Sequence, residues 1–134
     1  MNTLKYIAAI VATVALCGCA SGPSAPGDYA VFFANDKADI DADASKTIRQ
    51  AAETFRTGNY TSVAVIGHTD TTGPRSHNMD LSKRRADATR AELVRDGVPM
   101  DKIVSTGSGE AGNYVQTQNN AAEGQNRRVV IDLR

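Results

Sequence analysis

The chain has 134 residues, of which 41% are apolar and none is Trp, and its 15 basic residues balance 15 acidic ones. This length and composition predict one globular domain with a single core, and they exclude a disordered or fibrous chain. The formal net charge of zero excludes the broad cationic surface that nonspecific binding to nucleic acid requires. We therefore expect no nucleic-acid partner.

Residues 1–18 have the pattern of a secretory signal peptide. Lys5 precedes an apolar run from Tyr6 to Cys17 that only Thr13 interrupts. A helix needs ~20 apolar residues to span a bilayer, so this run is too short to span and fits a cleaved signal instead. We leave residues 1–18 out of the expected fold.

The end of this signal, "LCGC" at Leu16 to Cys19, resembles the lipobox of bacterial lipoproteins. The resemblance implies that Cys19 is the lipidated N-terminus and that its acyl chains anchor the protein stably to a membrane. Because Ala20 follows, it also implies sorting to the outer membrane, with the domain facing the periplasm. The alternative is an ordinary cleaved signal with a free Cys. A disulfide is not expected, because Cys17 and Cys19 are too close in sequence to close a stabilising loop.

A short linker separates the lipidation site from the folded domain. Ala20 to Asp28, "ASGPSAPGD", is rich in Pro, Gly and Ser and lacks apolar periodicity, which is typical of a linker. The domain is expected to occupy residues 29–134. Its first segment, "YAVFF" at Tyr29 to Phe33, is β-branched and aromatic and predicts a strand.

The next segments alternate between helical and extended patterns. Apolar residues recur at helical spacing across residues 44–55, so this stretch predicts a helix that ends at Gly58. Asp41 or Asp43 is its expected N-cap. The short apolar run "SVAVIG" at Ser62 to Gly67 is typical of a buried strand.

The C-terminal half predicts a second helix and two further strands. The helix is expected to bury Leu81, Ala88, Ala91 and Leu93 or Val94, and to end before Gly97 and Pro99. Lys102 to Ser108 predicts a strand and residues 109–126 a loop. The final segment, "RRVVIDLR", alternates in polarity and predicts a strand with Val129, Ile131 and Leu133 on one face.

The order β-α-β-α-β-β predicts an α/β fold of the α+β sandwich kind, with the helices packed on one sheet. Strand-helix-strand crossovers favour parallel pairing with right-handed connections. The last strand follows no comparable helix, so it is expected to be antiparallel and to make the sheet mixed.

Polar residues are unusually dense in "VIGHTDTTGPRSHNMDLSKRR", residues 65–85. Asp70 follows the carboxyl end of the second predicted strand, where ligands of open α/β sheets bind. Arg85 lies in the first turns of the following helix. Gly73 and Pro74 allow the loop between them to turn back, so we expect the two side chains to converge on one ligand.

A carboxylate and a guanidinium together suit a zwitterion. Asp70 can accept hydrogen bonds from an ammonium, and Arg85 can hold a carboxylate through a bidentate fork. Thr72 and Asn78 add short donors and acceptors beside them. The alternative is structural: a helix-to-loop salt bridge for the charged pair, and capping or turn hydrogen bonds for Thr72 and Asn78.

Three ordered motifs, "GHTDTTGPRSHNMDLSKRRADATRAELVRDGV", "KIVSTGSGE" and "NRRVVIDL", resemble the C-terminal periplasmic domain of outer membrane protein A. Peptidoglycan-associated lipoprotein and flagellar stator proteins share this domain. The resemblance covers roughly residues 31–133 and implies an OmpA-like fold. It also implies noncovalent binding of peptidoglycan at meso-diaminopimelate, whose free end is an amino-acid zwitterion.

Carried over residue by residue, the resemblance assigns ligand contacts to Asp70, Arg85, Asn78, Thr72 and, at a less conspicuous position after the first strand, Asp36. It gives Arg127 and Arg128 a structural role outside the site. The chain departs from the family pattern in the loop after Ser108, which lacks a common Pro and is shorter before "NRR". The conformation of residues 109–126 therefore stays open.

Other functions fit the sequence less well. His68 and His77, with Asp70 or Asp80, lack the usual spacing of a zinc site, and we expect no metal or cofactor. A wall hydrolase needs an activated nucleophile or a carboxylate pair with a base, which has no evident place here, so no enzyme is expected. The second hypothesis is a protein-interaction module of the Tol type, in which wall binding is secondary.

Overall fold

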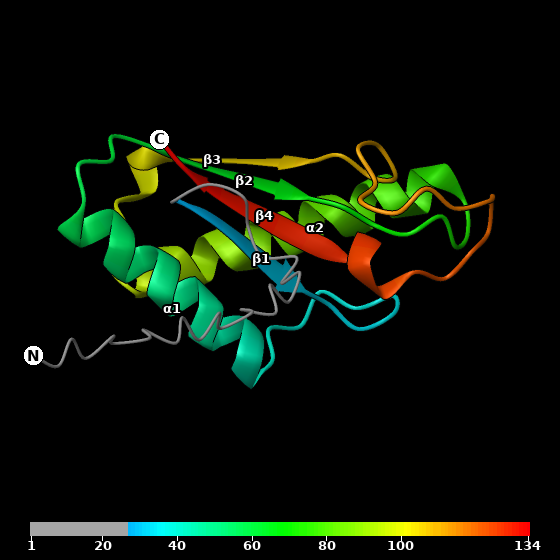
Figure 1. Ribbon diagram of the computed structural model, residues 1–134, viewed down its shortest axis with the longest axis horizontal. Helices are drawn as coiled ribbons and strands as arrows, with labels where there is room; N and C mark the ends of the chain where they lie inside the picture. The colour runs from blue at the N-terminus through cyan, green and yellow to red at the C-terminus, as the bar shows by residue number, and fades with distance from the viewer. Residues whose placement is uncertain (1–26) are drawn as a thin grey trace, which may run out of the picture.

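The structure is a computed structural model that describes residues 27–134 (Figure 1). The predicted signal peptide and Cys19 lie outside the described residues. The first strand, β1 (Asp28–Phe32), begins at the last residue of the predicted linker, because Asp28 already pairs with Asp132 in the sheet.

Four strands form one mixed sheet in the order β1-β4-β2-β3. Strand β2 (Val63–Gly67) runs parallel to β3 (Ile103–Gly107), and β4 (Arg128–Leu133) lies antiparallel to both β1 and β2. The predicted mixed sheet with an antiparallel last strand is confirmed. Since Gly67 is opposite Val129, the beginning of β4 lies beside the end of β2.

Helices α1 (Ala42–Thr57) and α2 (Arg75–Arg95) pack on the sheet and against each other. Asp41 is the N-cap of α1, where its carboxylate accepts a hydrogen bond of 2.8 Å from the backbone N–H of Ala44. Gly58 is the C-cap. Both ends of α1 are therefore as predicted, and this fits the preference of Asp for N-caps.

The core lies between the sheet and the two helices. The alternation predicted for β4 is confirmed, because Val129, Ile131 and Leu133 are buried while Val130 and Asp132 are partly exposed. The other buried apolar side chains of the core come from the sheet, from both helices and from their connections: Val31, Phe33, Ala44, Ile48, Ala51, Ala52, Val63, Val65, Ala86, Leu93, Val98 and Ile103. Burial of a large apolar side chain contributes ~1.5–3 kcal/mol, so this cluster provides the main driving force for folding.

The buried face predicted for α2 is confirmed at Leu81 and Leu93 and wrong at Ala88 and Ala91. Ala91 is exposed and Ala88 only partly buried, while the helix buries Asn78, Leu81, Ser82, Arg85, Ala86, Thr89 and Leu93. The cause is a close approach to the sheet: a Cβ atom at Gly67 would lie 1.9 Å from the carbonyl oxygen of Ser82. Small and polar side chains therefore face the sheet where an apolar stripe was expected.

The described residues also form two short 3₁₀ helices, η1 (Met100–Lys102) and η2 (Gly124–Asn126), and η2 lies in the long connection between β3 and β4. Within residues 27–134, no helix is long and apolar enough to cross a membrane.

Candidate functional site

A cavity of about 450 Å³ lies beside the end of β2 and the beginning of α2. All the residues predicted to contact a ligand line it: Asp36, Asp70, Thr72, Asn78 and Arg85. They come from the loop after β1, the loop after β2 and the first three turns of α2. The structure thus brings together residues that are dispersed along the chain.

Asp70 is almost fully buried, with 4% of its surface exposed. Its Oδ1 accepts a hydrogen bond from the backbone N–H of Thr72 at 3.2 Å. Its Oδ2 accepts one from the backbone N–H of Glu123 at 3.2 Å and one from Arg127 Nη1 at 3.1 Å. A carboxylate has about four acceptor positions, so three fixed donors orient Asp70 and leave it capacity for a ligand.

Arg85 exposes none of its surface. Its Nε donates to the carbonyl of Lys37 at 2.8 Å, and Nη1 and Nη2 donate at 3.0 Å to the carbonyls of His68 and Ala34. The guanidinium also stacks 5.3 Å from the centre of the Phe33 ring. Three of its five N–H groups therefore have partners among the described residues, and no partner is seen there for the other two.

Burial lowers the pKa of Arg85 to about 10, and the nearby negative charge of Asp70 opposes this shift. The guanidinium is therefore still charged at neutral pH. Its neighbour Arg127 carries a second positive charge. The cavity lining therefore holds the cation of Arg85 together with the carboxylates of Asp70 and Asp36, and Arg127 adds a positive charge beside Asp70 from outside the lining.

Asp70 and Arg85 do not form the direct ion pair that the structural alternative required. The ion-pair partner of Asp70 is Arg127, which the sequence reasoning placed outside the site. The topology contains a signal for this contact, since β4 runs antiparallel to β2 with Gly67 opposite Val129. The residues just before β4 must therefore lie beside those just after β2.

Asp36 and His77 lie at the mouth of the cavity. Their side chains are 64% and 45% exposed, and Asp36 Oδ1 lies 2.6 Å from His77 Nε2. The hydrogen bond from His77 is the main reason that the pKa of Asp36 is lowered. The sequence reasoning gave His77 no role, but the structure places it against a predicted site residue.

Asn78 and Thr72 form part of the wall. Asn78 Nδ2 donates to Glu110 Oε1 at 2.8 Å and to the carbonyl oxygen of Asp70 at 3.4 Å. Its side chain therefore joins α2 to two loops and does not cap the helix, whose N-cap is Pro74. The hydroxyl oxygen of Thr72 is buried without a hydrogen-bond partner among the described residues. A buried hydroxyl of this kind favours a ligand that can satisfy it.

His68 is a packed residue at the end of β2, as the sequence indicated. Its Nδ1 lies 2.9 Å from the carbonyl oxygen of Ala111, and burial lowers its pKa. No group of three or more potential metal ligands occurs in the part of the chain that the structure describes.

Comparison with known proteins identifies relatives of the chain. An outer membrane protein of Gluconacetobacter diazotrophicus is 42% identical over 117 residues, which cover 83% of this chain and 31% of that protein. A peptidoglycan-associated lipoprotein of Rhizobium meliloti is 33% identical over an alignment of 150 positions, which covers 93% of this chain and 85% of the relative. The chain therefore spans under a third of the first relative and most of the second.

Solved structures share the fold. The peptidoglycan-associated lipoprotein of Burkholderia pseudomallei matches with a TM-score of 0.72 at 23% identity, over 79% of this chain and 90% of that one. The C-terminal domain of Helicobacter pylori MotB matches with a TM-score of 0.69 at 21% identity, over 78% and 83%. Residues 32–128 match the OmpA family. The chain therefore belongs to the OmpA family.

Proposed function

We propose that the chain binds peptidoglycan noncovalently at the cavity of Asp70 and Arg85. The ligand group is the zwitterionic end of meso-diaminopimelate. The observation that carries the proposal is that oppositely charged buried side chains with unused hydrogen-bonding capacity line one cavity. Relatives named peptidoglycan-associated lipoprotein support the same polymer as ligand.

The charges suggest how the zwitterion is oriented. Its ammonium lies against the free acceptor position of Asp70, and its carboxylate lies against the two remaining N–H groups of Arg85. The unpartnered hydroxyl of Thr72 completes the polar wall. Each buried group then gains a partner that it lacks in the free protein.

Binding at Arg85 requires a local movement. The guanidinium has no exposed surface and donates to the carbonyls of Ala34 and Lys37. A ligand carboxylate therefore reaches it only when the loop that contains these two residues shifts. Asp36, in the middle of the loop, adopts a left-handed backbone with φ of 53°, which is uncommon for residues other than Gly, Asn and Asp. We expect the loop at residues 34–37 to move when the ligand binds.

We also propose that the domain tethers the outer membrane to the cell wall through a lipid on Cys19. The support is the lipobox-like "LCGC" and the outer membrane and lipoprotein relatives. The variant Cys19→Ala should leave the membrane fraction, and globomycin should block processing of the wild type. Retention of the variant in the membrane fraction contradicts lipid anchoring.

A sacculus pull-down tests wall binding. Purified residues 20–134, which include every described helix and strand, should sediment with diaminopimelate-type sacculi. Asp70→Ala and Arg85→Ala should lose this binding, and Arg84→Ala, which removes an exposed neighbouring cation, should retain it. Circular dichroism identifies variants that fail to fold, and for these Asp70→Asn and Arg85→Lys replace the Ala variants.

Two results contradict the proposal. Undiminished sedimentation of folded variants at both positions shows that the cavity is not the wall-binding site. Release of soluble muropeptides from the sacculi shows that the chain is an enzyme and not only a binding protein.

A further inference from the structure

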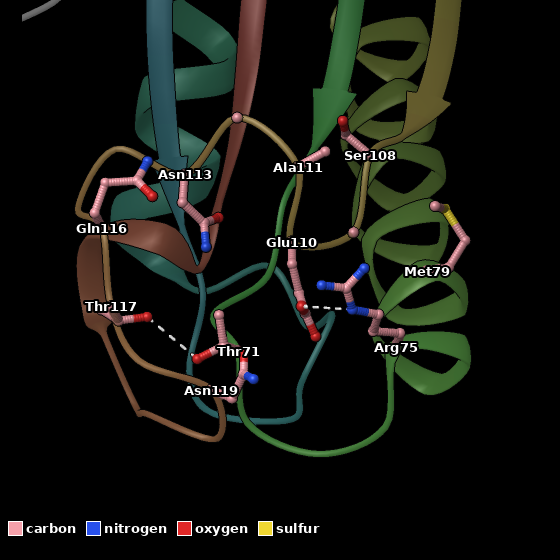
Figure 2. A pocket seen from close by; sticks show the side chains of 12 residues that line it. Thr71, Arg75, Met79, Ser108, Glu110, Ala111, Asn113, Gln116, Thr117 and Asn119 are labelled. Carbon is pink, nitrogen blue, oxygen red and sulfur yellow. Dashed lines mark hydrogen bonds and ion pairs between the residues drawn. The ribbon is translucent and has the colours of Figure 1, made fainter.

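A second cavity, of about 400 Å³, lies between α2 and the connection from β3 to β4 (Figure 2). Its lining includes Thr71, Arg75, Met79, Glu110, Asn113 and Gln116. The hydrogen bond from Asn78 to Glu110 separates it from the first cavity. The two cavities therefore share a wall, and neither the sequence motifs nor the proposed function uses the second one.

The second cavity presents an ion-paired carboxylate and one buried acceptor oxygen that lacks a donor. Glu110 Oε1 accepts from Asn78, but Glu110 Oε2 lies 3.6 Å from Arg75 Nε, beyond the usual distance of an N–H···O hydrogen bond. The Oδ1 atom of Asn113 is buried without a partner among the described residues. Because a buried acceptor is costly to leave unpaired, the cavity favours a ligand rich in N–H and O–H donors.

The two charged side chains of the second cavity compensate each other. Figure 2 shows Glu110 beside Arg75, so the lining carries one positive and one negative charge and has no net charge. The other polar lining groups, such as Gln116, Thr117 and Asn119, are uncharged amides and hydroxyls. These side chains both donate and accept hydrogen bonds, as sugar hydroxyl and acetamido groups do.

The wall also has an apolar part. Met79 lines the cavity and is 48% exposed. Its flexible thioether side chain adapts to irregular apolar surfaces, such as the C–H face of a sugar ring or an acetyl methyl group. An uncharged sugar that bears both hydroxyl and acetamido groups thus matches the acceptors, the charge balance and the apolar contact.

We propose that the second cavity is a subsite for N-acetylated sugars. This inference rests on the proposed function: the glycan strand of the polymer occupies the second cavity while its peptide reaches the first. The shared wall of Asn78 and Glu110 places the two subsites next to each other. The chain then recognises two chemically different parts of one polymer.

An NMR titration of ¹⁵N-labelled residues 20–134 with N,N′-diacetylchitobiose tests the subsite, because this disaccharide carries the acetamido sugars without any peptide. We expect saturable shifts of backbone amides at residues 108–119 and at Arg75 and Met79. Cellobiose, which has the hydroxyls without the acetamido groups, should bind more weakly.

Two variants locate the binding. Asn113→Ala removes the unpaired acceptor and Gln116→Ala removes an exposed amide of the lining, so each should weaken disaccharide binding by about three- to tenfold. Gln50→Ala removes an exposed amide on α1 and is the matched control, which should bind like the wild type.

Three results overturn the subsite. They are the absence of saturable shifts, shifts that gather around Asp70 and Arg85 instead, and equal binding by cellobiose or by both lining variants. A separate NMR titration tests the proposed function. A diaminopimelate tripeptide that shifts no amide around Asp70 contradicts that function, whatever the disaccharide does.

Discussion

Arg127 Nη1 donates a hydrogen bond of 3.1 Å to Asp70 Oδ2. The contact joins the loop after β2 to the residue before β4, and the Asp70 carboxylate is buried. Arg127→Ala leaves this carboxylate with only backbone donors, so the free energy of unfolding should fall by about 2–3 kcal/mol. Urea denaturation measures the change.

The matched control is Arg134→Ala. Arg134 pairs with Asp132 at 2.7 Å, but its side chain is largely exposed, and exposed pairs contribute about 0–1 kcal/mol. If both Arg variants lose the same small amount of stability, Arg127 does not hold Asp70 in place.

Gly67→Ala should disrupt the packing of α2 on the sheet. A Cβ atom at this position would lie 1.9 Å from the carbonyl oxygen of Ser82, which is backbone and cannot rotate away. Overpacking of this kind costs about 1–3 kcal/mol and occasionally more. Thermal and urea denaturation should show the loss.

Gly124→Ala is the control for this prediction. Its Cβ atom would contact only the end of the Arg127 side chain, at 3.4 Å. Its stability should therefore stay within about 0.5 kcal/mol of the wild type. A Gly67→Ala variant as stable as the control contradicts the close approach of α2.

Thr71 fixes the long connection between β3 and β4. Its hydroxyl donates to the carbonyl of Gln118 at 2.7 Å and accepts from the backbone N–H of Ala121 at 3.0 Å. Thr71→Val keeps the shape of the side chain and removes both hydrogen bonds, so the free energy of unfolding should fall by about 1–2 kcal/mol. Amide hydrogen exchange at Ala121 should become faster.

Thr61→Val provides the comparison, because the Thr61 hydroxyl is exposed and makes one hydrogen bond of 3.3 Å to Arg134. Its exchange pattern at residues 108–123 should match the wild type. Unchanged protection of Ala121 in Thr71→Val means that other contacts hold the connection.

His68 should make stability depend on pH below neutrality. Burial, and secondarily the charge of Arg128, lower the pKa of His68 from its ordinary value of 6.5. Below pH 6.5 the unfolded chain takes up a proton that the folded chain resists, so stability is lost as the pH falls towards the lower folded pKa. The slope from one group is at most about 1.4 kcal/mol per pH unit.

Urea denaturation between pH 5 and pH 8 checks this sign. His68→Gln removes the titrating group, and its stability should decline less than that of the wild type on acidification. An equal or steeper decline in the variant contradicts the assignment to His68.

The sequence was sufficient for the elements whose local signals agree with their packing. Helix α1 has an Asp at its N-cap, apolar residues at helical spacing and a Gly at its end, and its bounds are as predicted. The polarity of β4 alternates along the strand, and its buried face is also as predicted. Local preference and tertiary burial favour the same structure in these segments.

Apolar spacing predicted only part of the buried face of α2, namely Leu81 and Leu93, because a tertiary constraint decides the rest. The helix packs so closely on Gly67 that it buries Ser82, Arg85 and Thr89, which a pattern of hydrophobicity counts as exposed. Three N–H groups of the buried Arg85 donate to carbonyls from two distant loops. Such partners are visible only in the folded chain.

The candidate site was predictable as a set of residues, but its internal contacts were not. The five predicted ligand residues line one cavity, while their role in binding stays a prediction. The sequence reasoning did not find that Arg127 pairs with Asp70, that His77 contacts Asp36, or that Glu110 joins Asn78. These contacts depend on where the connections between strands fold, and the conformation of residues 109–126 had no local signal.

The most direct test of zwitterion recognition compares two tripeptides that differ in one carboxylate. L-Ala-γ-D-Glu-meso-diaminopimelate carries the distal ammonium and carboxylate, and L-Ala-γ-D-Glu-L-Lys carries only the ammonium. Loss of a charge-assisted hydrogen bond costs about 1.5–3 kcal/mol, so we predict that residues 20–134 bind the lysine tripeptide at least about tenfold more weakly in calorimetric titration. Equal affinity for the two tripeptides would contradict the recognition of diaminopimelate by Asp70 and Arg85.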